Sequence, residues 1–217
     1  MKGLGRNIKY ASRMLIILFS IYLMGIIILV LLGLGEMDFV NSVIQMLPVA
    51  TMYIPFILML IAVGYAEMFC RHMVFLGSAR KPAAYAIIIS VQVFVLLQMV
   101  LFFALTLLAK DSVANEVVWS CPLGFIAIFL AIMGIGLWLD SLSLSGHYVL
   151  AIVFGSLWAL IAVVLMCGVS TYIAVEENAE LLVPFNSIWL LLAGLAVDLI
   201  GTFLYYKAVV KADLKLA

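Results

Sequence analysis

The sequence predicts an all-α, polytopic membrane protein: one domain, 1–217, with six transmembrane helices and both termini in the cytoplasm. Hydrophobic residues make up 68% of the chain, charged residues only 10%, and the hydrophobic residues gather in six long runs. Ordinary soluble domains are about 45–50% apolar and about 25% charged. A chain of this composition therefore has too little polar surface to cover a globule in water.

The residues before the first span, 1–13, form a short basic amphipathic segment. Apolar residues recur there at helical spacing and basic residues fill the positions between them: Leu4, Ile8 and Ala11 against Arg6, Lys9 and Arg13. Such a helix suits the surface of an anionic inner leaflet. The same charges also serve as a positive-inside anchor. The two readings are compatible.

Six apolar stretches are long enough to be spans, because a helix needs roughly 20 apolar residues to cross the hydrocarbon core. These predicted spans are about 14–34, 48–66, 84–109, 119–139, 148–174 and 185–206. Trp119 and Trp189 begin spans and Trp138 ends one, as is typical of aromatic residues at membrane interfaces.

Lysine and arginine predict the orientation of these spans. Every basic residue except Lys110 precedes span one, lies between spans two and three, or follows span six. Basic flanking residues resist translocation, so this side is expected to be cytoplasmic.

No catalytic motif is evident. The sequence lacks a Walker A pattern, H-E-x-x-H and G-x-S-x-G, and its cysteines, Cys70, Cys121 and Cys167, have no metal-ligand spacing. The two histidines, His72 and His147, lie near predicted cytoplasmic ends. We therefore expect no catalytic residue, metal site or cofactor on this chain.

One carboxyl residue, Asp198, and two glutamines, Gln92 and Gln98, lie inside predicted spans. An unpaired carboxylate there costs at least ~2.5 kcal/mol, so Asp198 should face protein or water, or be protonated. It shares a helix face with Gly194 and Gly201, which favours the close approach of another helix. Asp198 is either a pathway residue or a packing residue bonded to a neighbouring helix. Gln92 and Gln98 lie roughly 240° apart around the helix, which favours separate interhelical hydrogen bonds.

The loop at 67–83, between spans two and three, is the most distinctive polar feature. Gly77-Ser78 predicts a helix end, and Pro82 suits the first turn of a new helix. We expect a short helix or turn parallel to the membrane that exposes Arg80 and Lys81 to the cytoplasm. The loop is either a topological anchor or a docking element for a soluble partner.

The stretch from Phe75 to Lys81, Phe-Leu-Gly-Ser-Ala-Arg-Lys, resembles the first cytoplasmic loop of small ABC-2-type permeases of bacteria. The span number, cytoplasmic termini and amphipathic start are similar to that family as well. The resemblance implies a membrane-spanning permease subunit in the bacterial cell membrane. It implies ATPase-coupling residues at the following positions: Arg71, Gly77, Ser78, Arg80 and Lys81.

The same resemblance implies the partners and the cargo. A cytoplasmic ATP-binding subunit would bind and hydrolyse ATP, and a second copy or a related permease would complete a dimer in the lipid bilayer. No nucleic-acid partner is expected. The expected function is export of an antimicrobial peptide, giving antimicrobial peptide resistance, or of a hydrophobic drug or a lipid.

Two features depart from that family or favour other classes. The stretch 170–187 leaves little room for the re-entrant hairpin that many such permeases place before span six, and the second cytoplasmic loop, 140–147, has no basic residue. One alternative is the vitamin-binding membrane subunit of an importer, which also has six spans but needs a polar external pocket. The other is a regulatory membrane protein that transports nothing.

Overall fold

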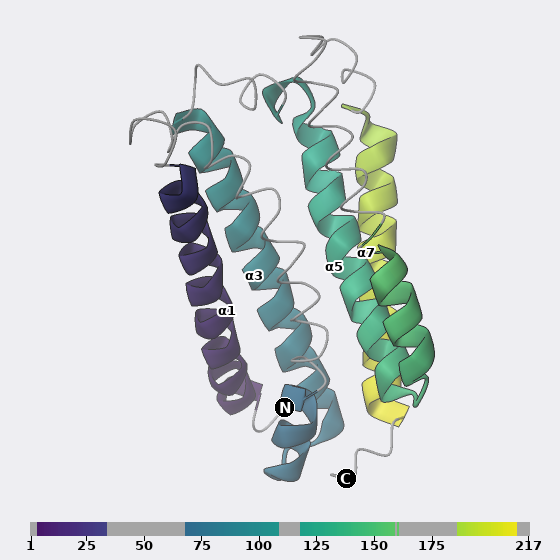
Figure 1. The fold of residues 1–217 in the computed structure, drawn as a ribbon. Helices are drawn as coiled ribbons and strands as arrows, with labels where there is room; N and C mark the ends of the chain where they lie inside the picture. Colours follow the sequence, from purple (N-terminus) through teal and green to yellow (C-terminus); the bar gives the residue numbers. More distant parts are fainter. Residues whose placement is uncertain (1–3, 34–67, 109–117, 159, 161–185, 212–217) are drawn as a thin grey trace.

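The computed structural model describes residues 4–33, 68–108, 118–158, 160 and 186–211, and the regular structure in these ranges is helical throughout. Four long helices dominate: α1 (Leu4–Gly33), α3 (Arg80–Leu108), α5 (Pro122–Leu144) and α7 (Ile188–Lys211) (Figure 1). Shorter helices cover 68–75 and Tyr148–Trp158. The predicted all-α class is confirmed for this part of the chain.

Three described helices are long and apolar enough to cross a membrane: Arg80–Ala104, Pro122–Leu144 and Ile188–Lys211. They coincide with the third, fourth and sixth predicted spans. The protein is therefore a membrane protein by the length and composition of these helices. The second span, most of the fifth and most of the 170–187 stretch lie outside the described residues. The total of six spans and the orientation of the termini stay predictions.

Helix α1 joins the amphipathic segment to the first predicted span without a break over 30 residues. The apolar face of its first turns packs on the protein core, where Ala11 is completely buried and Leu4 and Ile8 are partly covered. Arg6 and Lys9 remain exposed. The protein interior, rather than a lipid leaflet, therefore covers the face that we expected to lie on the membrane.

The long helices form two side-by-side pairs, α1 with α3 and α5 with α7 (Figure 1). Each pair is parallel, and the two pairs run in opposite directions. Helix α3 links them by touching both α5 and α7. Its Phe102 ring lies 5.4 Å from Phe125 and 5.6 Å from Phe129 of α5, centroid to centroid.

Small residues bring α5 and α7 into backbone contact. A Cβ atom added to Gly194 would lie 2.6 Å from the carbonyl oxygen of Ala127, and one added to Gly201 would lie 2.7 Å from Cα of Gly134. Ala127 and Gly134 are seven residues apart, as are Gly194 and Gly201, so the two parallel helices meet in a matching register. The expected close approach at the glycine face of α7 is confirmed, and α5 is the partner.

Helix α5 is longer at its end than the sequence suggested. The predicted loop 140–147 is helical as far as Leu144. The hydroxyls of Ser141 and Ser145 donate to carbonyl oxygens of earlier residues in the same helix, at 2.6 and 2.7 Å, so these polar side chains need no water. Gly146 then ends the helix with φ of +85°, a backbone conformation that glycine adopts without steric cost.

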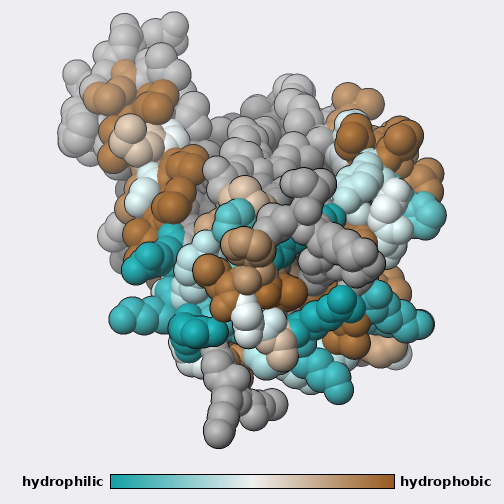
Figure 2. Space-filling model, turned by 90° about the horizontal axis from the view of Figure 1, so that it is seen from below, coloured by the Kyte–Doolittle hydropathy of each residue, from teal (hydrophilic) through white to brown (hydrophobic). Residues whose placement is uncertain are grey.

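Basic residues mark one end of the bundle, at the bottom of Figure 1, where α1 and α3 begin and α7 ends. We call this the basic end. Figure 2 views it directly and shows hydrophilic side chains spread across it. The exposed basic side chains of the described residues there are Arg6, Lys9, Arg13, His72, Lys81, His147, Lys207 and Lys211.

Candidate functional site

The predicted loop at 67–83 is a short helix followed by a tight turn at the basic end. The helix covers 68–75 and ends where Gly77 takes φ of +82°. The Gly77 N–H donates to the Val74 carbonyl at 3.0 Å, and the Ser78 N–H donates to the Met73 carbonyl at 2.9 Å. These two bonds define a Schellman motif. The helix end predicted from Gly77-Ser78 is therefore confirmed, and α3 begins two residues later with Pro82 in its first turn.

Polar contacts brace this helix-turn against three other elements. The Asn7 side-chain amide of α1 donates to the Ser78 hydroxyl at 2.5 Å. Arg71 Nη2 donates to the Tyr148 hydroxyl at 2.9 Å, and Arg80 Nη1 lies 3.4 Å from the Val210 carbonyl oxygen in the last turn of α7. Two of the predicted coupling arginines thus make contacts within the chain.

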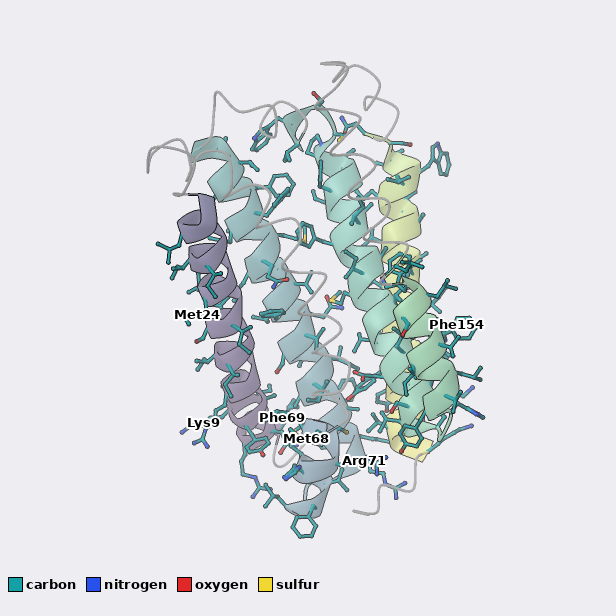
Figure 3. All side chains as sticks on the ribbon, viewed as in Figure 1. Lys9, Met24, Met68, Phe69, Arg71 and Phe154 are labelled. Carbon is teal, nitrogen blue, oxygen red and sulfur yellow. The ribbon has the colours of Figure 1, made fainter. Side chains whose placement is uncertain are left out.

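Aromatic and apolar contacts strengthen the brace on the α1 side. The rings of Tyr10 and Phe69 lie 5.3 Å apart, and Cys70 and Met73 are buried in the core. In Figure 3, Met68 and Phe69 lie beside the lower end of α1, while Arg71 lies nearer the α5–α7 pair. The 68–75 helix therefore contacts α1 on one side and, through Arg71, the Tyr148–Trp158 helix on the other.

The outward surface of the helix-turn is apolar. Phe75 and Leu76 are 69% and 59% exposed, although they are the last helical residue and the first turn residue at the basic end. We call this pair the tip. His72 and Lys81 are exposed beside it along the chain. The basic residues around the turn did not predict the tip, although two large apolar residues directly before a turn glycine are visible in the sequence.

A second group of polar side chains lies between α3 and α7. The Gln92 amide nitrogen of α3 lies 3.1 Å from both carboxylate oxygens of Asp198, and the Thr202 hydroxyl lies 3.5 Å from one of them. Asp198 is only 6% exposed. Gln98 lies apart from this group. It is 2% exposed, and its amide nitrogen has no hydrogen-bond partner among the described residues.

Asp140 is a second buried carboxyl, which the sequence did not predict. It is 2% exposed on α5, where we expected a loop. The buried residues Phe129, Met133 and Leu137 recur every four residues on one face of α5, and Asp140 follows three residues later on the same face. That periodicity is visible in the sequence, but the first polar residue after an apolar run predicts the end of a span, which places the end at 139.

Among the residues that the structure describes, no three His, Cys, Asp or Glu side chains gather in a way that could hold a metal ion. Cys121, just before α5, is buried in the core, with 4% of its surface exposed.

Comparisons with protein-family models, with curated proteins and with solved structures found no match for this chain.

Proposed function

We propose that this chain is the membrane-spanning permease subunit of a bacterial ABC transporter, with ATP hydrolysed on separate cytoplasmic subunits. The observation that carries the proposal is the exposed apolar tip, Phe75 and Leu76, held on a braced helix-turn at the basic end. Large apolar residues at the end of a bundle, away from the lipid-facing sides of the helices, suit a protein partner.

The tip has the composition of an interface anchor. Aromatic and aliphatic side chains that enter a pocket at the centre of an interface contribute most of the binding energy, while charged residues form the rim. Phe75 and Leu76 would fill such a pocket on the ATPase, and Lys81 and His72 would lie at its edge. Arg71, Ser78 and Arg80 would act as positioning residues, because their contacts lie within the chain.

The brace explains how a push on the tip would reach the membrane. The helix-turn leads directly into α3 and is bonded to α1 through Ser78 and Asn7. Through Arg71 it contacts Tyr148, at the start of the Tyr148–Trp158 helix. That helix packs on α5, with the rings of Trp138 and Phe154 5.5 Å apart. Closure of the ATPase subunits would therefore move several helices together.

In this proposal the chain works as a dimer with a second copy or a related permease. The cargo is a molecule that partitions into or along the bilayer, namely a peptide, a hydrophobic drug or a lipid, and the direction is export.

The test is a mild-detergent purification of the tagged chain from its native cell, with identification of the proteins that come with it. We expect a soluble protein bearing a Walker A motif. Phe75→Ala with Leu76→Ala should reduce its recovery at least about tenfold, because losing 1.4 kcal/mol of anchor energy corresponds to that factor.

The matched control is Val149→Ala with Ile152→Ala, which removes two equally exposed apolar side chains, 74% and 67%, from the neighbouring helix. It should leave recovery unchanged. A chain that always purifies alone would refute the permease reading. Tight retention of a small polar ligand would then favour the vitamin-importer subunit, and its absence a regulatory protein.

A further inference from the structure

Helices α3 and α7 pack against each other along a contact that we call the α3–α7 seam. Polar residues occur in it at three levels between the basic end and the middle of the helices. Arg80 meets the Val210 carbonyl at the end. Further in, the rings of Tyr85 and Tyr206 lie 5.2 Å apart. Deepest is Gln92 against Asp198. As the number on α3 rises, the number on α7 falls, as an antiparallel pair requires.

Helix periodicity aligns these groups into one continuous row. On α7, Asp198, Thr202 and Tyr206 follow one another at intervals of four residues, about 6 Å along the axis. On α3, Tyr85 and Gln92 are seven residues apart, about 10 Å, and share a face. The Thr202 hydroxyl lies 3.5 Å from a carboxylate oxygen of Asp198, and Tyr206 follows Thr202 by about one helical turn.

The row is exposed at the end that contains Tyr85 and buried at the end that contains Asp198. Tyr85 is 40% exposed near the basic end, and Lys81, one turn further out, is exposed as well. Asp198 is almost fully buried. Among the described residues, the side chains that contact its carboxylate are the neutral Gln92 and Thr202.

The third helix around Asp198 adds no charge at that level. Helix α5 presents Gly134 there, and a Cβ atom on that glycine would lie 2.6 Å from Cα of Asp198. The buried carboxyl of α5, Asp140, lies six residues nearer the basic end, about 9 Å along the axis. Among the described residues no cation faces Asp198, and burial between apolar helices disfavours a charged carboxylate and so favours its protonated form, whereas the donors Gln92 and Thr202 favour the charged form.

We infer that Asp198 is a proton-binding site that exchanges its proton with the compartment at the basic end, through the hydroxyl row of the α3–α7 seam. The proton moves between water at Tyr85 and Tyr206 and the carboxylate by way of the Thr202 hydroxyl. This inference does not depend on the proposed function, since it needs no ATPase.

The test uses the full chain in sealed proteoliposomes and N,N′-dicyclohexylcarbodiimide, which modifies buried carboxyls in their acid form. The pH is set separately inside and outside, and peptide mass spectrometry measures modification of Asp198. A membrane-impermeant amine reagent on Lys81 reports which compartment faces the basic end. We expect Asp198 labelling to rise severalfold when that compartment is acidified, and to stay constant when only the opposite one is.

Two variants test the proton route through the hydroxyls while leaving the proton-binding residue Asp198 unchanged. Thr202→Val and Tyr206→Phe each remove one hydroxyl at nearly constant shape, and each should slow the labelling response severalfold after a pH jump. Labelling at equal pH on both sides should stay near the native level. Tyr10→Phe, outside the seam, should behave like the native chain. Labelling that ignores pH, that follows the opposite compartment, or that responds equally fast in the hydroxyl variants would overturn the inference.

Discussion

Adding one methyl group at Gly194 should force α5 and α7 apart. In Gly194→Ala the new Cβ would lie 2.6 Å from the carbonyl oxygen of Ala127 and 2.8 Å from its Cα. Real Cβ atoms essentially never approach another heavy atom closer than 3.0 Å. The helices must therefore separate by at least about 0.4 Å, the difference between 3.0 and 2.6 Å. The obstacle is backbone, so no side chain can rotate away.

The expected cost follows from measurements of overpacked interiors, about 1–3 kcal/mol. For chains of 150–250 residues, 1 kcal/mol changes Tm by roughly 2–4 °C, so Gly194→Ala should lower Tm by roughly 2–12 °C. Thermal unfolding in detergent, followed by circular dichroism or by loss of the monodisperse peak, measures this shift.

Gly155→Ala is the matched control, because Gly155 is also buried in a helix but its added Cβ would lie 3.7 Å from Leu139 Cδ1, an ordinary contact. It should be neutral or stabilising by up to roughly 1 kcal/mol, as alanine favours helix over glycine. Equal Tm values for the two variants would refute the account of the α5–α7 contact.

Four further single substitutions and one double variant test other parts of the structure by the same Tm measurement. Gln98→Leu should stabilise the protein by about 1 kcal/mol or more, because it removes a buried amide nitrogen that has no hydrogen-bond partner among the described residues. Gln92→Leu should destabilise the protein by a similar amount, because it leaves Asp198 without its main hydrogen-bond donor. A lower Tm for Gln98→Leu would contradict the predicted stabilisation. Gly77→Ala should cost about 1–2 kcal/mol for its left-handed conformation, although its added Cβ meets nothing within 4 Å, and an unchanged Tm would refute the turn. Ser78→Ala should cost about 0.5–1.5 kcal/mol through the lost bond from Asn7, and a double variant with Asn7→Ala should cost little more; additive losses would show that the two residues do not interact.

Local signals predicted the elements well. Apolar runs located α3, α5 and α7, and Gly77-Ser78 located the end of the 68–75 helix, because each depends only on residues close in the chain. The C-terminal end of α5 was predicted too early. The serine hydroxyls after Asp140 donate to carbonyl oxygens of the same helix, so these polar residues continue the helix and do not end it.

The sequence did not predict which residues far apart in the chain contact one another. Gly194 and Gly201 predicted that some helix would approach, but the choice of α5 depends on the matching register of Ala127 and Gly134. The direction of Arg71 depends on Tyr148, which lies 77 residues away along the chain. The arginines therefore looked exposed in the sequence, whereas the structure turns them toward the chain and exposes the tip instead.

The most direct test of the proposed docking places a photo-cross-linking amino acid at position 75 in living cells, with position 149 as the control. Both positions are exposed, at 69% and 74%. The account predicts a cross-link from position 75 to a soluble protein bearing a Walker A motif, and none to that protein from position 149. Adducts to lipid alone at position 75, or the same protein adduct from both positions, would contradict the account.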